Sequence, residues 1–210
     1  MNQLPPFSKD VQAVYDALLA LPLQCSDAYQ QAKGIKLPAA YKKCKQVIVA
    51  GMGGSNLGLR IIRAVYKDEL TVPVELVNHY TLPAYAGKQT LVIASSYSGT
   101  TEESLMVAQQ AHKKGCKVVV VAAGGILVEW AKNRKLPVYQ FVPTHNPSGQ
   151  PRMGVGYSIF TLLAVFKQIG LAIKEQEVTD IVAHLTNLSE DWSAEQPTMV
   201  NRPKHIANEL

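Results

Sequence analysis

Two short stretches of glycine, serine and threonine carry side chains and backbone groups that suit anion binding. The first is Gly51-Met52-Gly53-Gly54-Ser55-Asn56, and the second is Ser95-Ser96-Tyr97-Ser98-Gly99-Thr100-Thr101. Glycines let backbone N–H groups approach a ligand closely, and hydroxyls add neutral donors, which together suit a phosphate group. Each neutral hydrogen bond contributes only about 0.5–1.5 kcal/mol, so several must act together. The pattern predicts a phosphate cradle built from both loops.

The two loops can be compared with the known sequence motifs for nucleotide binding. A dinucleotide fingerprint needs a third glycine where Asn56 stands, and an acidic residue where the next predicted strand ends in Asn78-His79. A Walker A loop needs Gly-Lys-Ser/Thr, which neither loop contains. The loops therefore favour a small anionic ligand over NAD or ATP. An ordinary glycine-rich turn capped by Ser or Thr remains the alternative.

Apolar runs before the two loops predict the elements that hold them. Residues 47–50 and 91–94 are typical of buried parallel strands, whose carboxyl ends meet at one edge of a sheet. We predict an α/β fold, a three-layer sandwich with a five-stranded parallel sheet and helices on both faces. The expected strands are 47–50, 72–77, 90–95, 117–122 and 136–142, and the helices between them are 55–67, 101–114 and 125–134. Ser55 is expected to open its helix and Thr101 to cap the next, while residues 78–89 form a loop with at most one helical turn.

Helical patterns flank this alternation. Segments 8–21 and 23–32 precede it, and 155–169, 175–190 and 201–210 follow it. The predicted organisation is a helical segment (1–40) that packs on the sheet, a ligand-binding domain (41–170) and a helical linker (171–210). We expect a further domain to be absent from this chain, with a natural C-terminal helix as the alternative.

Arg152 is the strongest single candidate outside the loops. It precedes the apolar helix 155–169, close to the end of the last strand, and a guanidinium binds phosphate in a bidentate manner. An exposed surface arginine is the alternative. His79 and His145 lie in predicted loops, where a structural or solvated role is simpler than a catalytic one.

Composition narrows the class of protein. Lys and Arg outnumber Asp and Glu by 21 to 16, but they are scattered without interleaved aromatics, which favours a solvated face over a nucleic-acid groove. No apolar run reaches the 18 residues of a membrane span, and the first residues lack a signal-peptide pattern. The three cysteines, Cys25, Cys44 and Cys116, show no metal spacing, so reduced thiols and a cytoplasmic location are expected.

Several segments together resemble sugar isomerase (SIS) domains, and more closely the N-terminal half of bifunctional phosphoglucose/phosphomannose isomerases. They are Val49 to Ser55, Tyr80-x-Leu82-Pro83, Ser96 to Glu103, Pro151-Arg152 and Asn201-x-x-Lys204-x-Ile206-Ala207. The resemblance implies a flavodoxin-like sheet and a reaction without metal or nucleotide cofactor. An SIS domain without its partner domain exposes apolar helices, so a homodimer is expected. It implies that a sugar 6-phosphate is gripped by Ser55, Ser96, Ser98 and Thr101, with Gly53 and Gly54 lining the sugar site. Arg152 matches the arginine that stabilises an enediolate.

The family relationship also implies the reaction. The complete enzyme would interconvert glucose 6-phosphate, mannose 6-phosphate and fructose 6-phosphate through a cis-enediol(ate). This chain departs from the family pattern at Thr100, where Asn is usual, and at Pro203, where Ala is usual. Nothing here matches the glutamate and histidine that a second SIS domain supplies. Two alternatives stay open: an SIS module that senses a sugar phosphate as a regulator, and a one-domain phosphosugar isomerase that recruits His79 or His145.

Overall fold

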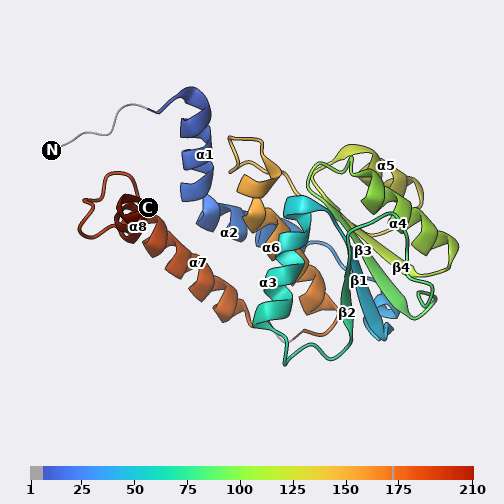
Figure 1. Ribbon diagram of the computed structural model, residues 1–210. Coiled ribbons are helices and arrows are strands. Elements are labelled where there is room, and N and C mark those ends of the chain that lie inside the picture. The colour runs from blue at the N-terminus through green and yellow to red at the C-terminus, as the bar shows by residue number, and fades with distance from the viewer. Residues whose placement is uncertain (1–6, 172) are drawn as a thin grey trace.

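A computed structural model describes residues 7–171 and 173–210, and Figure 1 shows their arrangement. The strands are β1 (Gln46–Ala50), β2 (Val74–Val77), β3 (Thr90–Ser96), β4 (Lys117–Ala122) and β5 (Val138–Gln140). The α-helices are α1 (Lys9–Leu19), α2 (Leu21–Lys33), α3 (Leu57–Val65), α4 (Glu102–Lys113), α5 (Gly125–Asn133), α6 (Val155–Gln168), α7 (Glu175–Asp191) and α8 (Arg202–Glu209). Short 3₁₀ turns are η1 (Ala39–Lys43), η2 (Gly53–Asn56) and η3 (Pro151–Met153).

The five strands form one parallel sheet in the order β2-β1-β3-β4-β5. β1 and β3 are direct neighbours, and their register pairs Ala50 with Ala94. The loops that follow these two strands therefore leave the sheet side by side at its carboxyl edge. This confirms the predicted sheet and its strand direction.

Alternating side chains of the strands feed two separate cores. On one face Val47, Val49, Leu91 and Ile93 pack with residues of α3 and α6, together with others of the same cluster. On the other face the intervening residues, such as Ile48 and Val92, pack with α4 and α5. Both faces are covered, so the strands are apolar on both sides, and the sequence shows continuous apolar runs.

The remaining helices pack around this core, and α2 contributes buried residues to it. α2 packs mainly against α6, and α7 packs against α2, so the first and last thirds of the chain meet there. Figure 1 shows α7 leading away from the sheet towards α8, which lies near α1. Among the helices in the described residues, none combines the length and apolarity needed to cross a bilayer.

Several predicted boundaries were wrong. Ser55 does not open a helix: the turn η2 precedes α3, because Gly53 has a positive φ of +50° and the Ser55 hydroxyl binds elsewhere. β2 begins only after Pro73 and β5 only after Pro137, since proline removes a donor from the ladder. The predicted loop over residues 78–89 is confirmed: it contains turns but no helix.

Glu175 of α7 forms ion pairs with Lys33 of α2 and Lys167 of α6. These pairs predict how the stability of the fold depends on pH. Hydrogen bonds from Lys167 (2.5 Å) and then Lys33 (3.0 Å) lower the pKa of the Glu175 carboxyl to about 2. The folded pKa lies below the unfolded one, so the stabilisation is present above pH 4.5 and lost as the pH falls towards 2. Because the side chain is 56% exposed, solvent screening limits this to at most about 1 kcal/mol.

NMR titration of the Glu175 carboxyl checks this. Lys167→Met is expected to bring its pKa back towards the ordinary range, whereas Lys132→Met, at a lysine that bonds Gln140 instead, serves as the control. An ordinary pKa for Glu175 in the unmodified chain would contradict the prediction.

Candidate functional site

The first loop (residues 51–56) and the second loop (residues 95–101) are joined by direct hydrogen bonds. The backbone N–H of Tyr97 donates to Ser55 Oγ at 2.9 Å, and Ser95 Oγ donates to the carbonyl of Ser55 at 3.4 Å. Ser55 is buried, with 5% of its surface exposed. Its hydroxyl oxygen therefore accepts one hydrogen bond from the second loop.

The hydroxyls of the second loop form two pairs. Ser96 is buried and accepts the N–H of Gly99 at 3.0 Å, while its Oγ shares a 2.8 Å hydrogen bond with Thr101 Oγ1. Ser98 and Thr100 are exposed, and their hydroxyl oxygens are 2.8 Å apart. The pair of Ser96 and the half-buried Thr101 holds the loop in shape, and the pair of Ser98 and Thr100 is open to solvent.

Thr101 is the N-cap residue of α4, as predicted, but its side chain makes no capping hydrogen bond. Its hydroxyl is directed to Ser96 instead. The first turn of α4 therefore offers backbone N–H groups at the positive end of a 12-residue helix, next to the exposed Ser98 hydroxyl. This is the arrangement that binds phosphate in other α/β proteins.

Gly99 fixes the outer boundary of the second loop. It has a φ of +73°, and a Cβ on it would lie 1.7 Å from the carbonyl oxygen of Gly124. Its own carbonyl accepts the N–H of Leu127 at 3.0 Å. The second loop is thus packed onto the loop that follows β4, which sequence reasoning did not include in the site.

Arg152 lies in η3, with an exposed side chain and its backbone against the first loop. A Cβ on Gly54 would be 3.4 Å from the Arg152 Cα. The carbonyls on either side of Arg152 are held from inside the molecule. Asn146 Nδ2 donates to the carbonyl of Gln150 at 2.9 Å, and Gln24 Nε2 donates to that of Met153 at 2.9 Å. The backbone that carries the Arg152 guanidinium is therefore held against the first loop.

The two loop histidines have structural contacts. His79 Nδ1 accepts the N–H of Thr81 at 3.2 Å, and the backbone N–H of His145 donates to the hydroxyl of Tyr157 at 3.1 Å. The Tyr157 hydroxyl donates in turn to Asp27 at 2.9 Å, and burial raises the pKa of this tyrosine. Both histidines are held as parts of loops.

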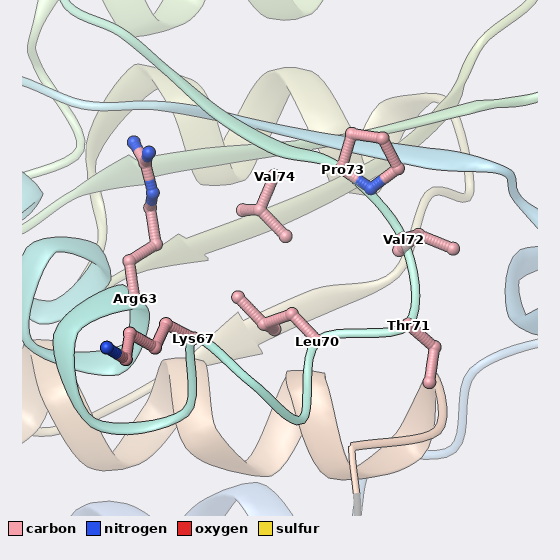
Figure 2. Close-up of a pocket in the computed structure, with 7 residues that line it drawn as sticks. All are labelled: Arg63, Lys67, Leu70, Thr71, Val72, Pro73 and Val74. Atoms are coloured by element: carbon pink, nitrogen blue, oxygen red, sulfur yellow. The ribbon is translucent and has the colours of Figure 1, made fainter.

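A separate hollow of about 400 Å³ lies away from these loops and is lined by residues of α3 and of the segment before β2. Figure 2 shows Arg63 projecting from α3 and Lys67 from the turn that follows it, beside Leu70 to Val74. It lies at the amino edge of the sheet, whereas ligands of open α/β sheets bind at the carboxyl edge. We therefore place the candidate site at the two loops.

Sequence reasoning missed the residues that support the site from behind, which are Gln24, Gly124 and Asn146. Asn146 lies in the polar loop after β5, whose composition suggested only a connection. Gln24 lies in a helix far away in the chain, where nothing distinguishes it from a surface glutamine. It is fully buried and also bonds the carbonyls of Ala17 and His145.

Comparison with known proteins gives a consistent result. No protein-family model matches the chain. A bifunctional phosphoglucose/phosphomannose isomerase from Caldicellulosiruptor bescii is 35% identical over 199 residues, which are 94% of this chain and 57% of the relative. The structure of tagatose-6-phosphate ketose/aldose isomerase from Escherichia coli has a TM-score of 0.66 at 18% identity, covering 91% of this chain and 58% of that one. The Vibrio vulnificus NanR protein, solved in complex with ManNAc-6P, has a TM-score of 0.52 at 15% identity, covering 84% and 69%.

The fold of this chain is that of an SIS domain, as in the solved phosphosugar isomerases. In sequence it is a relative of the bifunctional phosphoglucose/phosphomannose isomerases, as its motifs indicated. The chain spans about half the length of the curated relatives it matches.

Proposed function

We propose that this chain forms the phosphate-binding half of an aldose–ketose isomerase acting on glucose 6-phosphate, mannose 6-phosphate and fructose 6-phosphate. One observation carries the proposal: Tyr97 N–H joins the two loops at Ser55, and Arg152 lies against the first loop at Gly54. These contacts support the proposal, because they hold the backbone of both loops and of Arg152 together at one edge of the sheet.

The phosphate is assigned to the second loop and the start of α4. Ser98 and Thr101 supply hydroxyls, Ser96 shapes the loop, and Ser55 donates its remaining proton from the first loop. Gly53 and Gly54 leave room for the sugar carbons between the phosphate and Arg152. The charge of Arg152 is then available to the opposite end of the sugar.

The chemistry requires a proton to move between C2 and C1. A base removes the C2 proton of the open-chain aldose, and the electrons pass to the carbonyl oxygen, giving a cis-enediolate. The Arg152 guanidinium stabilises the developing negative oxygen. A hydroxyl proton passes from O2 to O1, and the carbon proton returns at C1 to give the ketose. We propose that a second SIS domain supplies the base and the group that opens the sugar ring. Glu102 and Glu103 lie in the first turn of α4, at the phosphate end, and are not assigned to this role.

Ser98→Ala tests the position of the phosphate. Stabilisation by ligand at 100-fold excess over Kd approaches about 2.7 kcal/mol, so fructose 6-phosphate should raise the Tm of the unmodified chain. We expect this rise to shrink in Ser98→Ala, which removes a direct donor. Ser189→Ala removes a hydroxyl on α7 and is expected to keep the full rise. An equal rise in Ser98→Ala would move the phosphate away from the second loop, and no rise in any variant would overturn the proposal.

A regulatory module is the second candidate, favoured by the structural likeness to NanR in complex with ManNAc-6P. A one-domain isomerase is a further form of the first candidate and would use His79 or His145. Isomerase assays of residues 1–210 separate these possibilities. Appreciable turnover that is lost in a variant of either histidine would favour the one-domain enzyme. Ligand binding without turnover, even in a chain extended by a second SIS domain, would favour the regulator.

The proposal extends to location and assembly. The three cysteines are free thiols, which suits the reducing cytoplasm. Large apolar side chains are exposed on α1 and near α8, among them Val11, Leu18 and Met199, so we propose a homodimer that covers part of this surface. Light scattering on the purified chain measures the assembly directly, and a monomer at high concentration would contradict it.

A further inference from the structure

Tyr97 contacts both sides of the candidate site. Its backbone N–H donates to Ser55 Oγ at 2.9 Å in the first loop. Its side-chain hydroxyl accepts a hydrogen bond from Asn146 Nδ2 at 2.7 Å, in the loop that leads to Arg152. The residue is only 8% exposed, so its side chain lies almost wholly inside the molecule.

Asn146 also forms a hydrogen bond with the turn that carries Arg152. Its Nδ2 group also donates to the carbonyl of Gln150 at 2.9 Å. The same carbonyl accepts the N–H of Met153 at 3.0 Å, which closes the η3 turn around Arg152. The Tyr97 hydroxyl therefore orients the amide that fixes this turn.

The ring of Tyr97 is also fitted closely against the backbone that follows Arg152. A Cβ on Gly154 would lie 2.4 Å from Cε2 of the ring and 2.7 Å from its hydroxyl oxygen. On another side the ring packs against Phe141, with 5.5 Å between centroids. Only glycine, which has no Cβ, leaves room for the Tyr97 ring at position 154. The ring and the backbone after η3 are therefore in direct contact, and a shift of one affects the other.

We propose that Tyr97 is a positioning residue that sets the distance between the phosphate cradle and Arg152. The inference rests on the proposed role of Arg152. A substrate held at both ends needs the two binding groups at a fixed separation, and small misplacements are costly in such sites. The hydroxyl of Tyr97 is the atom that links the Arg152 turn to the second loop.

A double-mutant cycle tests this by calorimetry on the 210-residue chain. The ligands are 5-phosphoarabinonate, whose carboxylate stands in for the enediolate oxygens, and arabinitol 5-phosphate, which lacks that charge. We expect Tyr97→Phe to weaken binding of the arabinonate about tenfold and of the arabinitol less than twofold. In an Arg152→Ala background, Tyr97→Phe should have no further effect. Asn146→Ala removes the hydrogen-bond donor instead of the acceptor. It should change the ratio of the two ligand affinities as much as Tyr97→Phe does.

Tyr139→Phe is the matched control, because it removes a buried tyrosine hydroxyl that bonds Ile35 away from the loops. It is expected to leave the ratio of the two affinities unchanged. Equal weakening of both ligands by Tyr97→Phe, or the same effect with and without Arg152, would overturn the positioning role. An unchanged ratio in Arg152→Ala itself would instead overturn the proposed function of Arg152.

Discussion

Arg152→Ala is expected to weaken binding of 5-phosphoarabinonate by about 10- to 150-fold. A hydrogen bond to a charged group contributes about 1.5–3 kcal/mol, and the ligand carboxylate occupies the place of the enediolate oxygens. The stability of the fold should change little, since the Arg152 side chain is exposed. Calorimetry at two salt concentrations measures the loss, which should be smaller at high salt because an exposed charge is screened.

Two variants make this result specific. Arg152→Lys keeps the charge but loses the bidentate geometry, so its affinity should lie between those of the arginine and alanine forms. Arg134→Ala removes an arginine that stacks on Trp130 at 4.9 Å, remote from the loops, and should bind normally. If Arg134→Ala weakened the ligand as much as Arg152→Ala, a general positive field would explain both effects.

Gly99→Ala is expected to destabilise the chain by about 2–5 kcal/mol and to abolish phosphate binding. Part of the cost is a side chain at a φ of +73°, and the rest is the collision of its Cβ with the carbonyl of Gly124. Relief of the collision must move the second loop, which breaks the Ser96–Gly99 hydrogen bond. Urea unfolding gives the stability change, and the thermal shift with fructose 6-phosphate gives the binding.

Gly53→Ala separates the two parts of that cost. Gly53 also has a positive φ, but a Cβ there meets no atom within 4 Å. Its substitution should therefore cost only the backbone part, about 1 kcal/mol. If both variants lost the same stability, the close contact between Gly99 and Gly124 would not matter in solution.

The fold was predictable because its signals are local. Continuous apolar runs indicated strands covered on both faces, and the helical periods between them indicated parallel crossovers. The five parallel strands, the two covering layers and the meeting of both loops at one edge were confirmed. The predicted ends of strands and helices were wrong where backbone conformation, and not the apolar pattern, decides them, as at Pro73, Pro137 and Gly53.

The residues of the candidate site could also be predicted only in part. Residue types alone nominated Ser98 and Arg152, because hydroxyls after a strand and a cation before a helix suit a phosphorylated ligand. Their functions remain predictions for the experiments above.

The sequence by itself determined the sheet, the glycine- and hydroxyl-rich loops and the relationship to phosphosugar isomerases. Only the tertiary structure placed Gln24 under Met153 and Tyr97 against Asn146. These partners are 129 and 49 residues apart, and no periodicity or motif encodes such contacts. They arise because α2 and the loop after β5 pack against the same turn, and a buried polar group there must find a partner inside the protein.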